Sequence, residues 1–178
     1  MCGIAGFVNK NIKNKEEVIK KMADRIKYRG PDGEGYFIDD DVALAHRRLS
    51  IIDLSTGSQP MYNEDNSIVI VFNGEIYNFV ELKDELKSKG HKFKNKSDTE
   101  VIIHGYEEWG KNVVEHLRGM FAFAIWDQNT KTVFMARYHF GIKPLYYAKF
   151  NDTLMFASEI KAFLDHPDFK KELNKEIL

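Results

Sequence analysis

Residues 121–137 read FAFAIWDQNTKTVFMAR, which is two apolar runs separated by a few polar residues. The runs Phe121–Trp126 and Thr132–Arg137 have the length of strands and are rich in Phe, Trp and Val. The connection Asp127-Gln128-Asn129 between them is of hairpin length. Because a hairpin joins antiparallel neighbours, this stretch predicts an antiparallel sheet and disfavours a doubly wound parallel one.

Short apolar runs of the same kind recur along the chain, and Asn151-Asp152 has the composition of a second hairpin turn. The sequence therefore indicates many short strands with antiparallel neighbours. The predicted strands are Gly3–Val8, Gly35–Ile38, Val42–His46, Leu49–Ile52, Ser67–Asn73, Phe121–Trp126, Thr132–Arg137, Leu145–Phe150 and Thr153–Ala157.

Three longer stretches combine helical periodicity with residues that favour helix starts and stops. Asn14 precedes the first, Asn78 opens the second, and a capping box of Ser97 and Glu100 opens the third. The predicted helices are Lys15–Lys27, one between Asn78 and Gly90, one between Ser97 and Gly110, and shorter ones at Val113–Leu117 and Glu159–Leu164. In this order the elements predict an α+β fold in which helices cover layers of antiparallel sheet.

The composition is that of one globular domain, with 178 residues, 43% of them hydrophobic and 30% charged. A net charge of −1 gives no basic field for nucleic acid. No apolar run approaches the roughly 18 to 20 residues of a membrane span, and an export signal is missing, so we expect a cytoplasmic protein. The lone Cys2 excludes an internal disulfide, and the six histidines lack ligand spacing, so we expect no metal.

Cys2 is the first candidate for chemistry. If Met1 is removed, Cys2 has a free α-amino group, with a pKa of about 7.7 to 8.0 against about 8.5 for a free thiol, so the amine can accept the thiol proton. This is the arrangement of an N-terminal nucleophile. The glycines of the stretch MCGIAGF permit close approach of a substrate. The alternative is that Cys2 is only a small apolar residue at the start of a strand.

Asn73 and Gly74 follow an apolar run and place a side-chain amide beside a glycine N–H. Two adjacent donors are what an oxyanion requires. An ordinary turn is the alternative, since Asn-Gly is a frequent turn dipeptide.

A guanidinium from Arg47 or Arg48 and the carboxylate of Asp98 could together hold the two charged ends of an amino-acid substrate. Strand alternation does not fix which arginine faces inward. Asp98 has another explanation, because acidic residues favour the first turn of a helix. The stretch RGPDGEG at residues 29–35 is expected to form a loop, in the role of a mobile cover over a site.

Eight motifs in order along the chain resemble the class II, or N-terminal nucleophile, glutamine amidotransferases, and in particular the glutaminase domains of asparagine synthetases. They are MCGIAGF, RGPDGEG, LAHRRLSIIDLSTGSQPM, VFNGEIYN, KSDTEVI, GMFAFAIWD, FGIKPLYY and FASEIKA. The resemblance implies a four-layer αββα sandwich of two stacked antiparallel sheets flanked by helices. It also implies a glutamine amidotransferase type 2 domain at residues 1–165, and a C-terminal tail or the start of a linker at 166–178.

The resemblance implies hydrolysis of L-glutamine to glutamate and ammonia through a γ-glutamyl thioester. By this resemblance, Cys2 is the nucleophile, its amine is the base, and Asn73 and Gly74 form the oxyanion hole. Arg48 binds the substrate carboxylate, and Glu75 and Asp98 bind its ammonium group. The backbone of Leu49, Ser50, Ile51 and Ile52 lines the pocket.

The resemblance further implies that the ammonia passes to a synthetase domain, absent from these residues, in which ATP and magnesium are expected. The glutaminase part itself needs no cofactor. Alternatives are a related amidotransferase for another acceptor, or a non-catalytic module that binds glutamine or docks a partner. Whether the chain forms a homodimer stays open. Tyr138 stands where the family usually has an aspartate.

Overall fold

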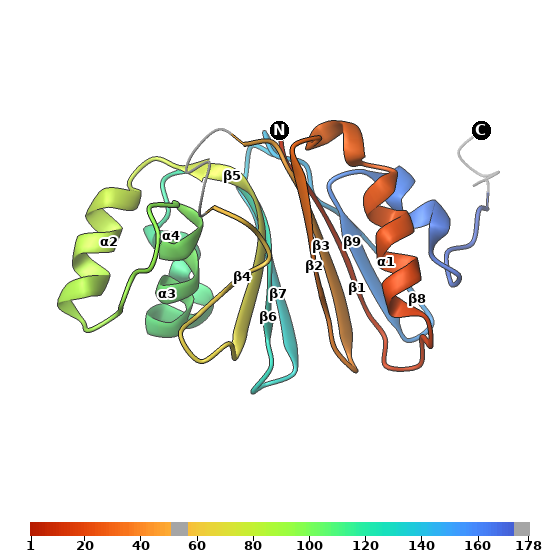
Figure 1. Ribbon diagram of the computed structural model, residues 1–178, viewed down its shortest axis with the longest axis horizontal. Coiled ribbons are helices and arrows are strands. Elements are labelled where there is room, and N and C mark those ends of the chain that lie inside the picture. Colours follow the sequence, from red (N-terminus) through yellow and green to blue (C-terminus); the bar gives the residue numbers. More distant parts are fainter. Residues whose placement is uncertain (51–56, 173–178) are drawn as a thin grey trace.

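Two antiparallel sheets lie face to face, and helices cover the outer face of each (Figure 1). The computed structural model describes residues 1–50 and 57–172 of the chain. One sheet has the strand order β2-β3-β1-β9-β8, and the other has the order β4-β5-β6-β7. This four-layer αββα sandwich confirms the predicted fold class.

Along the described residues, groups of strands alternate with helices. The strands are β1 (Gly3–Val8), β2 (Gly33–Ile38), β3 (Val42–Arg48), β4 (Met61–Tyr62), β5 (Ile68–Ile76), β6 (Gly119–Asp127), β7 (Thr132–Arg137), β8 (Tyr146–Phe150) and β9 (Thr153–Ala157). The α-helices are α1 (Lys15–Asp24), α2 (Phe79–Ser88), α3 (Thr99–Trp109) and α4 (Val113–His116), and the 3-10 helices are η1 (Lys27–Arg29), η2 (Gly110–Asn112) and η3 (Ile160–Asp165).

Both predicted hairpins form. Strands β6 and β7 pair antiparallel up to Asp127 and Thr132, and β8 and β9 pair up to Phe150 and Thr153. Strand β5 pairs with β6 along its whole length, although α2, α3 and α4 lie between them in the sequence. The local turns therefore set the pairing within each hairpin, and the long β5–β6 pairing completes the second sheet.

Apolar side chains fill three layers, because both faces of each sheet are covered. Alternation along β1 shows the division: Ile4 packs between the sheets, whereas Ala5 and Phe7 pack against α1. The layer between the sheets consists of Ile4, Val42, Leu44, Val69, Val71, Ala124, Trp126 and Phe156. Burial on both faces explains why these strands are nearly continuous apolar runs instead of alternating ones.

The predicted strand Leu49–Ile52 is wrong in its described part, because Leu49 and Ser50 are not in a strand. The N–H of Leu49 donates to the thiol of Cys2 at 3.3 Å, and the N–H of Ser50 donates to the carboxylate of Asp32 at 2.8 Å. These amides therefore bond outside any sheet ladder. Ile51 and Ile52 lie outside the described residues.

Two of the predicted helix caps do not form. The side chain of Asn14 makes no cap hydrogen bond, and α1 ends at Asp24, earlier than predicted. The side chain of Asn78 instead donates to the carbonyl of His116 at 3.0 Å and accepts from the N–H of Arg118 at 2.9 Å. Asn78 therefore connects the start of α2 to the segment that enters β6.

The capping box before α3 is also wrong in its details. The hydroxyl of Ser97 accepts from the N–H of Thr99 at 3.1 Å. The carboxylate of Glu100 does not reach back to Ser97 but accepts from the N–H groups of Lys94 and Asn95, at 2.7 and 3.1 Å. Glu100 therefore orders the connection between α2 and α3.

Residues beyond η3 pack on the first sheet. The ring of His166 lies edge-on to Phe7, and Phe169 packs against Phe150 and Phe163. The division into a domain at 1–165 and a tail or linker at 166–178 stays a prediction. Within residues 1–50 and 57–172, no helix has the length and apolar character that crossing a membrane requires.

His46 links the two sheets. It lies in β3, is 1% exposed, and its Nε2 lies 3.2 Å from the carbonyl oxygen of Phe72 in β5. Since a carbonyl only accepts, Nε2 carries the hydrogen. Burial, together with the charge of Arg48, outweighs this hydrogen bond and lowers the pKa of His46 to about 3.

The neutral His46 predicts a pH-dependent stability. Below about pH 6.5 the unfolded chain binds a proton on this ring, whereas the folded chain does not until about pH 3, so acidification favours unfolding. Between about pH 7 and pH 5 the wild-type protein should lose roughly 2 kcal/mol more unfolding free energy than His46→Gln. Urea unfolding across this range measures the difference. The exposed His139 supplies the control, since His139→Gln should follow the wild type; parallel curves for wild type and His46→Gln would contradict the prediction.

Candidate active site

A pocket of about 150 Å³ opens where several elements of both sheets end. Its size suits a small molecule. Residues from the N-terminus directly before β1, from β3, from β5 and from the start of α3 meet there, although they are far apart in the sequence. The lining residues are Met1, Cys2, His46, Arg48, Leu49, Gly57, Gln59, Phe72, Asn73, Gly74, Glu75, Ser97, Asp98, Thr99, Met120 and Lys143.

The thiol of Cys2 lies in this pocket, directly before β1. It donates to the carbonyl of Leu49 at 3.6 Å and accepts from the N–H of the same residue. The Nε of Arg29 donates to the carbonyl of Cys2 at 3.1 Å, and Arg29 forms an ion pair with Glu159 at 2.9 Å. Contacts on both sides therefore fix the thiol, and Met1 lines the same pocket.

Asn73 and Gly74 are not in a turn. Both lie within β5, opposite Ala122 and Phe121 of β6, which excludes the turn alternative. A Cβ on Gly74 would lie 2.5 Å from the carbonyl oxygen of Met120, so the close approach of β6 requires glycine at this position.

The side chain of Asn73 is in an unusual state. The residue is 2% exposed, and its amide nitrogen Nδ2 has no hydrogen-bond partner within residues 1–50 and 57–172. Leaving a buried donor without a partner costs about 1 to 3 kcal/mol. A donor held in this way on the wall of the pocket is available to a ligand.

The two neighbouring arginines point in opposite directions. Arg47 faces away from the pocket, with ion pairs to Asp24 and Glu34 and a hydrogen bond from its Nε to the carbonyl of Ala23 at 3.3 Å. Arg48 lines the pocket. The alternation of side chains along β3 thus decides the question that the sequence left open.

Two carboxylates line the pocket together with Arg48. Asp98 is 6% exposed, and its Oδ2 accepts from the N–H of Ile76 at 2.9 Å. Burial raises the pKa of Asp98, and the nearby charge of Glu75 raises it further. Asp98 does not cap α3 with its side chain, so its helical position alone does not explain it. The pocket therefore has a cation and two acidic groups, which complement the two charges of an amino acid.

Of the four residues predicted to line the pocket with their backbone, one does so. Leu49 is a lining residue and Ser50 is not, while Ile51 and Ile52 lie outside the described residues. The predicted cover at residues 29–35 is in part a loop that packs on the end of β3: a Cβ on Gly30 would lie 2.3 Å from the carbonyl of Arg47. Strand β2 begins at Gly33.

The sequence did not indicate several pocket residues. Gln59 accepts from the N–H of Phe72 at 2.7 Å and donates to the hydroxyl of Thr99 at 3.4 Å, so it connects β5 to α3. His46 and Lys143 are both buried in the lining. Lys143 stands in the motif FGIKPLYY, and both His46 and Gln59 stand in the motif LAHRRLSIIDLSTGSQPM, so these motifs could have drawn attention to all three.

The whole chain, residues 1–178, matches the family model described as "glutamine amidotransferase domain". The chain is 51% identical to glutamine-hydrolyzing asparagine synthetase 2 of Bacillus subtilis (strain 168), over 100% of this chain and 24% of that protein. It is 40% identical to amidase chry2 of Gibberella zeae, over 92% of this chain and 26% of that protein. The chain thus spans about a quarter of the length of these relatives.

A solved structure has the same fold. Glutamine phosphoribosylpyrophosphate amidotransferase from B. subtilis, complexed with ADP and GMP, superimposes with a TM-score of 0.75 at 22% sequence identity. The match covers 91% of this chain and 43% of that chain. At this identity the likeness concerns the fold alone, and it supports the two-sheet sandwich described above.

The raised pKa of Asp98 predicts the effect of its replacement on stability. Asp98→Asn keeps an oxygen that accepts from Ile76 but removes a buried ionisable group, so its melting temperature at neutral pH should exceed that of the wild type. The difference should shrink as the pH falls and the wild-type carboxylate takes up its proton. Asp98→Ala is the matched control, because it strands the buried N–H and should cost about 1 to 3 kcal/mol. An Asp98→Asn variant that melts below the wild type at neutral pH would contradict this account.

Proposed function

Because this chain belongs to the glutamine amidotransferase domain family, as a member of its class II branch, we propose that it hydrolyses L-glutamine to L-glutamate and ammonia. The observation that carries the proposal is the buried, unpartnered amide of Asn73 in the same pocket as the thiol of Cys2. The thiol of Cys2 is the nucleophile that attacks the side-chain amide of glutamine, and the amide of Asn73 donates a hydrogen bond to the oxyanion that forms.

The reaction starts with removal of Met1, which frees the α-amine of Cys2. The amine accepts the thiol proton, and the sulfur attacks the δ-carbon of glutamine. The carbonyl oxygen becomes an oxyanion, to which the side chain of Asn73 and the N–H of Gly74 donate. Collapse of this intermediate transfers a proton to the leaving nitrogen, releases ammonia and leaves a γ-glutamyl thioester. Water then attacks the thioester, releases glutamate and restores the thiol.

Substrate binding follows from the charges of the pocket. Arg48 pairs with the α-carboxylate of glutamine, while Glu75 and Asp98 pair with its ammonium group. The backbone next to Leu49 completes the wall beside the thiol. These roles use only groups of the chain itself, so the proposed hydrolysis needs no cofactor.

We further propose that the ammonia serves a synthetase domain that makes asparagine from aspartate, where ATP and magnesium act. The support is the 51% identity to an asparagine synthetase of which this chain matches 24%. The alternative, in which the ammonia serves another acceptor, is favoured by one observation: the 40% identity to amidase chry2 over 92% of this chain. The cytoplasmic location stays a prediction.

Two variants test the chemistry. Cys2→Ala should abolish release of glutamate from glutamine, and Asn73→Ala should lower kcat by about 10² to 10³ with little change in KM.

Intact mass after treatment with 6-diazo-5-oxo-norleucine should show one adduct on the wild-type protein without Met1, and none on Cys2→Ala. Activity that survives in Cys2→Ala would overturn the proposal. A Met1-free protein that binds glutamine without turnover or adduct would instead establish a non-catalytic module.

The two arginines provide a matched pair for substrate recognition. Arg48→Ala should weaken glutamine binding by about 2 to 5 kcal/mol, seen mainly as a higher KM, because the substrate carboxylate loses its partner in the pocket. Arg47→Ala should leave KM unchanged and lower the melting temperature, since it removes a buried side chain together with its contacts to Asp24 and Glu34 on the other face. Steady-state kinetics with both variants decides the assignment. Equal effects on KM would show that Arg48 does not bind the substrate.

A further inference from the structure

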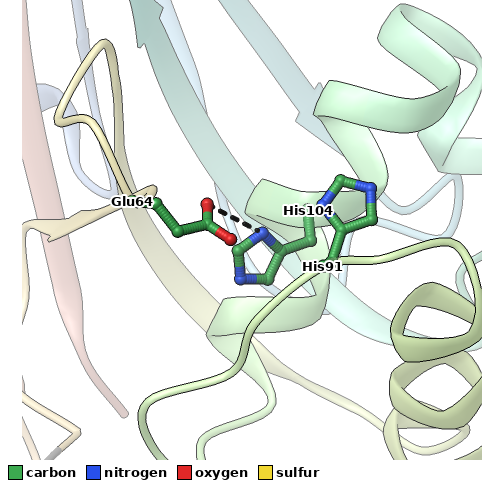
Figure 2. Close-up of side chains that lie close together, drawn as sticks. All are labelled: Glu64, His91 and His104. Atoms are coloured by element: carbon green, nitrogen blue, oxygen red, sulfur yellow. Dashed lines mark ion pairs between the residues drawn. The ribbon is translucent and has the colours of Figure 1, made fainter.

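A second cluster of titratable side chains lies away from the pocket, on the helical layer that covers the second sheet. Figure 2 shows Glu64, His91 and His104 converging from three segments: the turn between β4 and β5, the connection after α2, and helix α3. One ligand atom from each of the three lies within 4.8 Å of those of the other two. No pattern in the sequence indicated this cluster, because His91 and His104 do not share a helix.

Glu107 completes the group. Its Oε2 lies 2.8 Å from Nδ1 of His104 and 3.6 Å from Nδ1 of His91, and Glu64 Oε2 lies 3.6 Å from the same nitrogen of His104. Two ligands about 2.0 to 2.1 Å from a tetrahedral zinc ion are roughly 3.3 Å apart. The three contacts of Glu107 and Glu64 with the histidines, at 2.8 to 3.6 Å, lie on either side of that spacing.

Each ligand group is held from behind by a further hydrogen bond. Glu107 keeps Oε2 toward the histidines because its Oε1 accepts from the amide of the buried Asn63 at 2.8 Å. Glu64 turns Oε2 inward because its Oε1 accepts from the N–H of Lys92 at 3.2 Å. Such outer partners are a regular feature of protein metal sites, where they orient the ligands.

His104 has a second, independent feature of a ligand. It is 1% exposed, and within the part of the chain that the structure describes its Nε2 has no hydrogen-bond partner. Nε2 lies 3.8 Å from Oε1 of Glu100, which two backbone N–H groups hold in place. A small approach of Nε2 to Glu100 would fix the tautomer with Nδ1 free to bind, as is common for metal-bound histidines.

The charge of the cluster also favours a cation. Glu64, Glu100, Glu107 and Glu108 gather here, and Lys89 pairs with Glu108 at 2.9 Å. The acidic groups outnumber the lysine that pairs with them, so the centre attracts positive charge.

We propose that His91, His104, Glu64 and Glu107 form a binding site for a first-row divalent cation of the zinc class. Two imidazoles and two carboxylates suit zinc better than magnesium or calcium, which prefer oxygen ligands alone. The ion would tie the β4–β5 turn and the connection after α2 to helix α3. His91 and Glu64 are partly exposed, so solvent reaches the site.

Zinc titration against a chromophoric chelator tests the site in the full chain. The parent protein carries Cys2→Ala, because a thiol and an amine at one residue would bind zinc themselves. We expect one tight equivalent in the parent and at least about tenfold weaker binding in His91→Gln and in Glu107→Gln. His139→Gln, which removes an exposed histidine elsewhere, should bind as the parent does.

Two further measurements separate a metal site from a proton-bearing ion-pair network. Zinc should raise the melting temperature of the parent but not of His91→Gln, because only a folded site binds the ion. Cobalt should give the absorption of a four-coordinate nitrogen–oxygen site in the parent and lose it in His91→Gln. The absence of saturable zinc binding in the parent, or equal affinity in the parent and His91→Gln, would overturn the proposal.

Discussion

The packing of the two sheets against each other is the constraint on which the rest of the structure depends. Ile4 of β1, Val71 of β5 and Phe156 of β9 belong to one buried layer, so the sheets have a fixed mutual position. Cys2 precedes Ile4 by two residues, and Asn73 follows Val71 by two. The same apolar contacts that stabilise the fold therefore bring the thiol and the buried amide to one pocket.

The sequence predicted the parts of the fold that depend on local pattern. The hairpins at Asp127 and Asn151 form as expected, because turn composition and strand length are local properties. The strand predicted at Leu49–Ile52 is wrong in its described part. Its apolar pattern is that of a strand, but the N–H groups of Leu49 and Ser50 donate to Cys2 and Asp32 instead of to a neighbouring strand. A pattern of side chains does not reveal where the backbone hydrogen bonds go.

The site shows the same limit at the level of single side chains. The dipeptide Asn73-Gly74 is typical of a turn, and only its pairing with β6 places it in a strand. The choice between Arg47 and Arg48 needed the observed alternation of β3. The contacts of His46 and Gln59, and the meeting of His91 with His104, were beyond prediction, since no local period connects these residues to their partners.

Helix α3 connects the pocket with the histidine–glutamate cluster. Asp98 precedes its first residue and lines the pocket, while His104 and Glu107 lie on its later turns. The chain from Gln59 to Glu64 makes a second connection, with one end at the pocket and the other at the cluster. Asp98 is buried and Asn73 lacks a partner, and both states cost stability that packed surroundings must offset. Helix α3 and the segment from Gln59 to Glu64 both have contacts at the pocket and at the cluster, and such support from surrounding elements is what a preorganised site requires.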